Sequence, residues 1–417
     1  MRIIRLTGAV ERRLLRGRQQ RDRGAERVAA RIIGDVRRRG DAGLFAWTRK
    51  LDGMELDRGS VWVSRDEMRA AAGSVSREFV RAVKHAARNV RRVAEKQMPR
   101  GWMLEVEPGV RVGQIVRPIE CIGCYIPGGR HALISTLAMT AVPATVAGVE
   151  RIVVVCPRPN AELLATASLL GITEIARIGG AQAIAALAYG TASVPRVEKI
   201  FGPGNRYVTA AKQLVSGDCA IDLPAGPTEA IVLASRGDPR WIAADLLAQA
   251  EHAPDATSFL VTTSRLLAKK VQLEIEEQLE RLPRTNPAHA SIRRVGAILL
   301  ASSLAAACEF VNRFAPEHLS LPHDERFLLE KCRAAGTIFL GAWAAQPLGD
   351  YASGSNHVLP TAGWARRRGG LSAADFVKCI SVQSISRQGF SRLAKDVQSL
   401  ARAEGLAAHA AAVEVRR

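Results

Sequence analysis

The sequence predicts an α/β fold with two parallel sheets. Short runs rich in Val, Ile and Leu alternate with helical segments of about ten residues, which is the rhythm of βαβ units. Gly and Pro punctuate the ends of most of these runs, as expected where a buried strand turns toward a helix. The alternation occurs in two separate series along the chain. We therefore predict two incomplete, Rossmann-like domains, with small helical segments at the N- and C-terminal ends.

The N-terminal third is predicted to be mostly helical. Residues 25–53 carry apolar residues at three-to-four spacing with a Gly-Asp break at 40–41, and residues 78–98 show a second amphipathic pattern. Residues 106–129 alternate in short runs interrupted by Gly and Pro, and this pattern predicts strands. The first residues, 1–14, are expected to form a helical arm.

Two series of predicted strands follow. The first comprises residues 151–157, 174–180, 198–204 and 219–226. The second comprises residues 229–235, 258–264, 296–302 and 336–342. Helical patterns separate most of these runs, so each series is expected to build one parallel sheet. From about residue 372 onward the pattern is mostly helical.

The bulk composition is that of a globular protein. The chain has 417 residues, of which 47% are hydrophobic and 24% charged, and this length allows two sizeable cores. The most apolar segment, 132–149, contains Ser, Thr and Pro, and predicts a buried helix rather than a membrane span. We find no continuous apolar region of a secretory signal near the N-terminus. Seven cysteines, an odd number, fit a reducing compartment, so a cytoplasmic location is expected.

The net charge of +19 is concentrated near the N-terminus. The first 50 residues contain 15 Lys and Arg against 5 Asp and Glu. One interpretation is a basic arm that binds nucleic acid, and it predicts strongly salt-dependent binding. The other is a solvated, Arg-rich helical surface. We favour the second, because aromatic residues make up only 5% of the chain and no stacking motif or zinc-finger spacing is present.

Four Gly-rich segments lie at the ends of predicted strands: GCYIPGG, IGGAQA, FGPGNRYV and DLPAGPTE. Ligands bind beyond the carboxyl ends of parallel strands, and Gly lets a phosphate approach the backbone. Any one segment could be only a tight turn, and none is a complete GxGxxG. Together they favour a nucleotide or cofactor crevice. The CxxC at 121–124 has no second pair, so both of its cysteines are predicted to be packing residues.

Polar residues on three segments could together hold a divalent metal. Gln249 and His252 are three apart on a predicted helix and therefore share a face. The other candidates are Asp350 and His357 in a turn-rich segment, and Glu404 and His409 on an Ala-rich helical segment. Each segment also has a plain structural interpretation: a polar helix end, a surface loop and a solvated helix. Together, Gln249, His252, Asp350 and His409 would form an N/O-only site suited to Zn²⁺, but spacing alone leaves their convergence open.

Glu317 and His318 stand side by side in APEHLSL, residues 315–321. This segment is predicted to be a short turn led by Pro316. Two adjacent titratable groups could serve one chemical step or two successive steps. Alternatively, they could be a helix terminus with a surface ion pair. An ordinary histidine pKa of about 6.5 suits a general base near neutral pH.

Taken in order, these motifs resemble the histidinol dehydrogenase family over nearly the whole chain. The matching segments are CYIPGGR, GGAQAIAALAYGT, GPGNRYV, DLPAGPTE, DLLAQAEH, APEHL, GDYASGSNHVLPT and EGLAAHA. The resemblance implies NAD-dependent oxidation of the alcohol L-histidinol to an aldehyde and then to the acid L-histidine, the last two steps of histidine biosynthesis. It also implies a homodimer with a shared active site and one Zn²⁺ per subunit.

The resemblance assigns roles to individual residues. His318 would be the general base, and Glu317 would activate the water that attacks the aldehyde. The implied metal ligands are Gln249, His252, Asp350 and, from the other subunit, His409. The implied substrate contacts are Thr228, His357 and Glu404, together with His318 and the four metal ligands. The implied NAD contacts are Tyr125, Gln182 and Asn205.

Two departures from the family pattern lie near these residues. Thr228 stands where the family usually has Ser, and HALIST (131–136) replaces the usual Tyr-Pro-Ser segment. They leave open a paralogous dehydrogenase acting on another polar alcohol, such as a sulfonated diol. The expected domains are residues 15–124 with 229–371, carrying the metal and catalytic residues; 125–228, with the NAD contacts; and 372–417, a mostly helical dimerisation segment.

Overall fold

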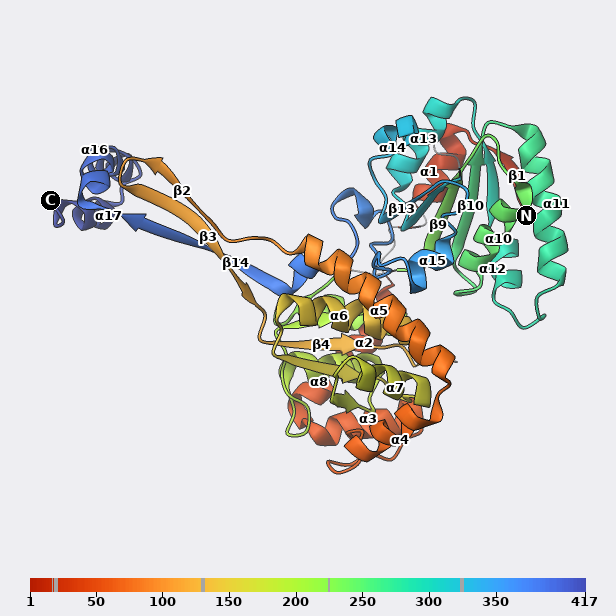
Figure 1. The fold of residues 1–417 in the computed structure, drawn as a ribbon, viewed down its shortest axis with the longest axis horizontal. Helices are drawn as coiled ribbons and strands as arrows, with labels where there is room; N and C mark the ends of the chain where they lie inside the picture. Colours follow the sequence, from red (N-terminus) through yellow and green to blue (C-terminus); the bar gives the residue numbers. More distant parts are fainter. Residues whose placement is uncertain (17, 19–21, 129–131, 224–225, 323–325) are drawn as a thin grey trace.

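Two parallel sheets form the body of the molecule, and a narrow antiparallel ribbon projects from it (Figure 1). The structure, a computed structural model, describes residues 1–16, 18, 22–128, 132–223, 226–322 and 326–417. Helices pack on both parallel sheets, as expected for a fold in which each sheet must bury two apolar faces. The predicted α/β class with two parallel sheets is confirmed.

The five-stranded sheet has the order β6-β5-β4-β7-β8, and all neighbouring strands are parallel. The strands are β4 (Cys121–Tyr125), β5 (Arg151–Val155), β6 (Glu174–Ala176), β7 (Lys199–Phe201) and β8 (Ala220–Ile221). The connecting helices are α6 (Ile134–Ala147), α7 (Ala161–Leu169), α8 (Gly180–Tyr189) and α9 (Arg206–Val215). The chain leads from β4 to one edge and returns to β7 on the other side, so the strand order reverses between β4 and β7. Cys124 on β4 is fully buried, as predicted for a packing residue.

The N-terminal helices pack on the helices that cover this same sheet. They are α2 (Arg23–Arg39), α3 (Asp41–Asp52), α4 (Arg65–Ser74) and α5 (Arg77–Gln97). The break between α2 and α3 falls at Gly40, as predicted, with a left-handed φ of 56°. Helix α2 packs against α8 and α9, and its Ile32 shares a core with Val153 and Ile184. The contacts thus differ from the expected grouping of residues 15–124 with the second sheet, because the apolar stripe of α2 fits the α8–α9 face.

The six-stranded sheet is also parallel throughout, in the order β1-β11-β10-β9-β12-β13. Its strands are β1 (Arg2–Arg5), β9 (Glu229–Leu233), β10 (Thr257–Thr262), β11 (Ala297–Leu300), β12 (His318–Leu321) and β13 (Thr337–Leu340). Its helices are α1 (Gly8–Arg16), α10 (Pro239–Ala250), α11 (Arg265–Glu280), α12 (Ala288–Arg294), α13 (Leu304–Phe314), α14 (Arg326–Lys331) and α15 (Gln346–Tyr351). The expected N-terminal helix is present as α1. Strand β1 precedes it and was not predicted, because its sequence, RIIR, has only two apolar residues between two charged ones.

The antiparallel ribbon consists of β2 (Trp102–Glu107), β3 (Val110–Pro118) and β14 (Val377–Ile385). Two short 3₁₀ turns, η1 (Trp364–Arg366) and η2 (Ala373–Phe376), precede β14. Helices α16 (Arg387–Ala403) and α17 (Ala407–Glu414) follow it and lie at the far end of the ribbon, away from both parallel sheets (Figure 1). The C-terminal part is thus helical as predicted, except that a nine-residue strand opens it.

The most apolar predicted segment is the buried helix α6, which the left-handed residue Gly148 terminates. Its fourteen residues are too few to cross a bilayer as a helix. Within the described parts of the chain, no helix is both long enough and apolar enough to span a membrane.

Candidate active site

The predicted catalytic pair lies at the amino-terminal end of an interior strand of the six-stranded sheet. Strand β9 begins at Glu229 and β12 at His318, and the two strands are parallel neighbours. Thr228 and Glu317 directly precede these strands. The prediction that residues 315–321 form only a turn is therefore wrong: four of them, from His318 on, form a fully buried strand. No Gly, Asn or Asp follows Pro316 in this segment, and burial on both faces favours the strand.

Glu317 is a buried carboxyl group held by two donors from the neighbouring strand. The Thr228 hydroxyl donates a hydrogen bond of 2.5 Å to Glu317 Oε2, and the Glu229 N–H donates one of 2.9 Å to the same atom. Burial is the largest cause of a raised pKa: against the two hydrogen bonds, which lower it, burial and the carboxylates of Glu229 and Asp350 together raise the pKa of Glu317 to about 8. Near neutral pH this carboxyl group is thus poised to gain or lose a proton.

His318 is held in one tautomer. Its Nδ1 lies 3.3 Å from the carbonyl oxygen of Glu229, and because a carbonyl can only accept, Nδ1 carries the hydrogen. Its Nε2 is buried and has no hydrogen-bond partner within the described structure, and it lies 3.8 Å from Asp350 Oδ1. Burial, with smaller contributions from His252 and His357, lowers the pKa of His318 to about 3, against the hydrogen bond to Glu229, which raises it. The imidazole is therefore neutral, with a free lone pair on Nε2.

One residue, Glu229, contacts both members of this pair through its main chain. Its N–H binds Glu317 and its carbonyl oxygen binds His318. Its own side chain is buried and accepts a 2.7 Å hydrogen bond from Arg18 Nε. Arg18 also donates a hydrogen bond to the carbonyl oxygen of Phe314, and its Cζ lies 3.5 Å from the centroid of the Phe314 ring. Neither Arg18 nor Glu229 was predicted as a site residue: Arg18 lies in no recognised motif, and Glu229, the last residue of DLPAGPTE, was assigned no role.

A chain of buried polar side chains continues from Thr228 into the second part of the site. Gln249 Nε2 donates a 2.6 Å hydrogen bond to the Thr228 hydroxyl, and Gln346 Nε2 donates to Gln249 Oε1. Gln249 and Gln346 are both buried. Gln346 was not predicted. The only signal available was its position four residues before Asp350, one helical turn away on α15.

His252 and Asp350 approach each other next to this chain. Helix α10 ends at Ala250, so His252 lies just beyond the helix and not, as predicted, on its face. Its Nε2 lies 4.0 Å from Asp350 Oδ2, and Asp350 comes from helix α15. Burial raises the pKa of Asp350 to about 6 and lowers the pKa of His252. Of the four residues whose convergence was left open, His252 and Asp350 thus approach each other, and the Gln249 side chain contacts Gln346 on the same helix as Asp350.

These side chains fit a divalent metal. The 4.0 Å between His252 Nε2 and Asp350 Oδ2 is longer than a hydrogen bond and shorter than twice a metal–ligand bond of about 2.1 Å. Gln249 Oε1 accepts one hydrogen bond and has a second lone pair for a metal. Within the described residues, no group of three His, Cys, Asp or Glu side chains could hold a metal ion. A metal here therefore depends on Gln249 and on a further ligand.

His357 and Asn356 connect the site to the first sheet. His357 Nδ1 donates to the Asp350 carbonyl oxygen over 2.8 Å, so its Nε2 accepts from the Thr136 hydroxyl over 3.2 Å. Asn356 Nδ2 donates a 2.7 Å hydrogen bond to the carbonyl oxygen of Met139 on α6. Thr136 is the last residue of HALIST, so this departure from the family pattern supports a site histidine. His131, the first residue of HALIST, lies outside the described residues, as do Gly129 and Arg130 of CYIPGGR and Pro224 and Ala225 of DLPAGPTE.

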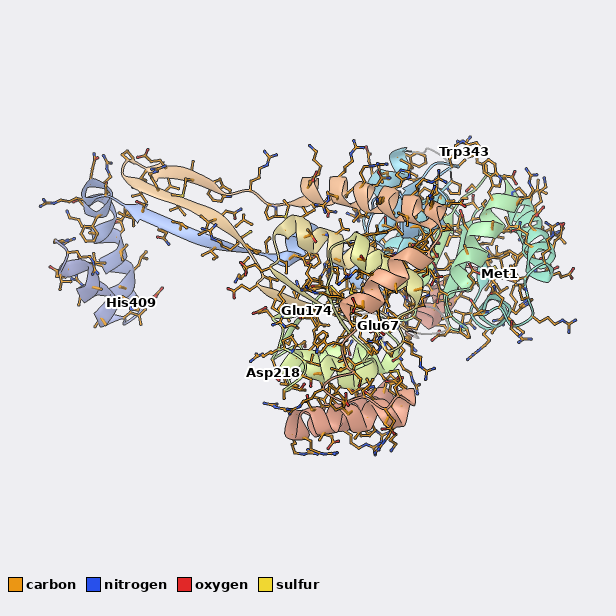
Figure 2. The ribbon with its side chains drawn as sticks, turned by 60° about the horizontal axis from the view of Figure 1, so that its bottom comes forward. Met1, Glu67, Glu174, Asp218, Trp343 and His409 are labelled. Atoms are coloured by element: carbon orange, nitrogen blue, oxygen red, sulfur yellow. The ribbon has the colours of Figure 1, made fainter. Side chains whose placement is uncertain are left out.

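Glu404 and His409 are not part of this cluster. Glu404 ends helix α16 and His409 lies on α17, and both side chains are exposed. Figure 2 shows His409 at the outer end of the molecule, beyond the ribbon and away from the two sheets. Within one chain, therefore, six of the eight residues proposed as metal or substrate contacts lie in this cluster, and Glu404 and His409 do not.

The predicted cofactor residues lie on the other sheet. Tyr125 is the last residue of β4, and its hydroxyl accepts a 3.1 Å hydrogen bond from the N–H of Gly180, at the start of α8. Gln182 Nε2 donates to Asp52 Oδ2 over 2.9 Å, while the buried Oε1 has no partner within the described structure. Asn205 caps α9 through bonds to the N–H groups of Tyr207 and Val208. All three predicted residues thus lie near strand ends or helix N-termini, where dinucleotide phosphates bind.

Comparison with known proteins supports the resemblance seen in the motifs. The family model described as histidinol dehydrogenase matches residues 15–417. Histidinol dehydrogenase of Geobacter sulfurreducens is 46% identical over 97% of this chain and 95% of its own length. That of Aquifex aeolicus is 45% identical over 94% and 92%. The crystal structure of histidinol dehydrogenase from Elizabethkingia anophelis superposes with a TM-score of 0.94 at 36% identity, covering 100% of this chain and 98% of the other. The chain belongs to the histidinol dehydrogenase family.

Proposed function

We propose that this protein oxidises L-histidinol to L-histidine through L-histidinal, with two molecules of NAD⁺ used in turn. This reaction comprises the last two steps of histidine biosynthesis. The observation that carries the proposal is the buried pair of Glu317 and His318 beside Gln249, His252 and Asp350, in a chain of the histidinol dehydrogenase family. A cytoplasmic location fits the seven cysteines and this biosynthetic role.

His318 acts as the general base. Its Nδ1–H is fixed on the Glu229 carbonyl oxygen, so the lone pair of Nε2 is directed into the site. Nε2 takes the hydroxyl proton of the alcohol. At the same time, hydride leaves the carbon that bears this hydroxyl and passes to NAD⁺. The side chain of Asp350 lies 3.8 Å from Nε2, where its negative charge favours the imidazolium that forms.

Glu317 acts in the second oxidation. As a carboxylate it takes a proton from the water that attacks the aldehyde carbon, and the hydrated aldehyde then transfers hydride to the second NAD⁺. His318 assists the loss of the second proton. Two neighbouring residues thus serve two successive steps at one carbon atom.

Gln249, His252 and Asp350 would hold a divalent metal, with Zn²⁺ as the family implies, and His409 of a second copy of the chain would complete the set. The metal would bind the imidazole and amine of the substrate and hold the reacting carbon in place. Thr228, His357 and Glu404 would also contact the substrate. Thr228 has a further effect of its own, because its hydroxyl joins Gln249 to Glu317 and so ties the metal ligand to the catalytic carboxyl group.

A homodimer would supply the missing residues. Apolar side chains are exposed along the ribbon and the C-terminal helices, among them Trp102, Leu104, Leu400 and Val415. Exposed apolar groups gathered on an extended arm are typical of a surface that another chain covers. NAD would bind at Tyr125, Gln182 and Asn205, at the carboxyl ends of the five-stranded sheet.

The test is the yield of NADH from zinc-loaded protein given limiting L-histidinol. We expect about two NADH per histidinol, with histidine as the product, because each oxidation transfers one hydride. No turnover, with NAD⁺ binding intact, would favour a related dehydrogenase for another polar alcohol. The observation favouring that second candidate is Thr228: its hydroxyl bonds to Gln249 and Glu317, and it adds a methyl group where the family usually has Ser.

A further inference from the structure

A buried ion pair joins helix α9 to the end of β8. Lys212 Nζ donates a hydrogen bond of 2.5 Å to Asp222 Oδ1, and the two side chains are 4% and 1% exposed. Neither residue has a part in the proposed chemistry. Burying two charges is expensive, and apolar side chains of similar size often stabilise a fold as well. The pair therefore calls for an explanation other than stability.

The pair holds the peptide groups on both sides of Gly202. Lys212 Nζ donates to the Gly202 carbonyl oxygen over 2.7 Å, and Asp222 Oδ2 accepts from the Gly202 N–H over 2.7 Å. One residue of the turn is thus fixed by a cation at its carbonyl and by an anion at its amide. Two opposite charges at fixed positions define the orientation of this residue more closely than apolar packing could.

Gly202 lies where the dinucleotide is proposed to bind. It directly follows β7, next to the end of β4, and the strand order reverses between these two strands. Dinucleotides bind at such a reversal, beyond the carboxyl ends of the strands. Gly202 has a φ of +107°, and a Cβ there would lie 2.2 Å from the carbonyl oxygen of Tyr125. The turn thus lies directly against Tyr125, and it leads within three residues to Asn205.

We propose that Lys212 and Asp222 are positioning residues for the dinucleotide: their ion pair fixes Gly202 in its left-handed conformation, and so places Tyr125 and Asn205 for binding. This inference rests on the proposed function, since it takes NAD to bind between β4 and β7. The pair touches the turn and not the ligand. Its removal therefore affects cofactor affinity and leaves the metal and substrate residues of the other sheet in place.

The test is calorimetric titration of NAD⁺ into the zinc-loaded full-length protein and its Lys212→Met variant. Without the ammonium group, the Gly202 carbonyl and Asp222 lose their shared donor and the turn relaxes. We expect the Kd for NAD⁺ to rise about tenfold, the lower end of the range for residues that orient binding groups from behind. The KM for NAD⁺ rises with it, while the KM for L-histidinol is unchanged.

Lys199→Met is the matched control. Lys199 is also a largely buried lysine of the same sheet, and it donates a 2.8 Å hydrogen bond to the carbonyl oxygen of Asp375. It lies at the opposite, amino-terminal end of β7, so its loss should not change the Kd for NAD⁺. If Lys212→Met fails to fold, Asp222→Asn takes its place, because a single amide oxygen cannot accept from both Lys212 and the Gly202 N–H at full strength.

The outcomes separate this inference from the proposed function. A higher Kd in Lys212→Met or Asp222→Asn, with Lys199→Met unchanged, supports it. An unchanged Kd in the folded variants, or an equal rise in the control, overturns it and leaves the NAD-dependent function intact. Failure of the unaltered protein to bind NAD⁺ at all overturns both.

Discussion

The predicted site residues fall into two groups with opposite surroundings. The buried group, Glu317, His318 and Gln249, lies at the edge of the six-stranded sheet, where hydrogen bonds from neighbouring strands and helices hold each side chain. The exposed group, Glu404 and His409, lies on the helices at the far end of the ribbon. In the buried group, the hydrogen bonds set the geometry, and burial shifts the pKa values of Glu317 and His318. The exposed group has no such surroundings, and under the proposed function a second copy of the chain supplies them.

The largest expected effect is that of His318→Asn. An Asn amide can still donate to the Glu229 carbonyl oxygen but has no basic nitrogen to replace Nε2. We expect both oxidations to slow by about 10³-fold, within the range for the loss of a general base. Steady-state rates with L-histidinol and with L-histidinal measure this, with NAD⁺ affinity as the control. A loss of less than about tenfold would show that another group accepts the proton.

Arg18→Met tests how the buried group is held together. The change leaves the Glu229 carboxylate buried without its cation, next to both catalytic residues. We expect the free energy of unfolding to fall by about 3 kcal/mol, as for other broken buried ion pairs. We also expect kcat to fall about tenfold with little change in the KM for NAD⁺.

The control for Arg18→Met adds a second substitution, Glu229→Gln. This substitution removes the carboxylate charge that Arg18→Met leaves unpaired. In chemical unfolding, Arg18→Met with Glu229→Gln should recover most of the stability that Arg18→Met alone loses. If the double variant is no more stable than the single one, the ion pair is not what holds Glu229.

Mixing two inactive variants tests whether the exposed group completes the site in another subunit. His409→Ala and His252→Ala are each expected to be inactive. Random heterodimers make up half of the mixture and contain one intact site each, so activity should return to about a quarter of the normal value. Heterodimers are identified by two different affinity tags. Heterodimers that form and stay inactive would argue against a shared site.

The pH dependence should differ between the two oxidations. Burial raises the pKa of Glu317 to about 8, and only its carboxylate form can activate water, so the rate of aldehyde oxidation should increase as pH rises through about 8. His318, with a pKa lowered to about 3, is already neutral across this range. Alcohol oxidation should therefore lack the rise that Glu317 produces. The measurement is the rate of L-histidinal oxidation at several pH values. We expect the rate to rise a few-fold through about pH 8 in the unaltered protein and not in Glu317→Gln. An identical profile in both would contradict it.

The sequence predicted the two parallel sheets because most of their strands lie in apolar runs between helical patterns, as in 151–157 and 258–264. It did not predict β1 or β12, since RIIR and HLSL each contain only two apolar residues beside polar or charged ones. The packing of α2 was also misassigned. An amphipathic stripe shows that a helix is half buried but not which of two sheets covers it.

The site was predicted unevenly for a similar reason. Motif residues such as Glu317, Asp350 and Gln249 could be named from the sequence, and the resemblance gave them roles. Residues that act through the fold could not, because Arg18 meets Glu229 across 211 positions and Gln346 meets Gln249 across 97. In open parallel sheets, ligand-binding residues are expected at the carboxyl ends of strands. Tyr125 lies at such an end, whereas His318 begins its strand and lies at the opposite end.

The most direct test of the account is a comparison of the two half-reactions in Glu317→Gln. In the proposed mechanism His318 acts in both oxidations and Glu317 in the aldehyde step alone. This division of roles has a direct kinetic consequence. It therefore predicts that oxidation of L-histidinol to L-histidinal proceeds at close to the normal rate, measured as the first NADH formed in a single turnover. Oxidation of added L-histidinal should fall by about 10²-fold or more, the usual effect of losing a water-activating base. Equal losses in the two half-reactions would contradict the division of labour between these neighbouring residues.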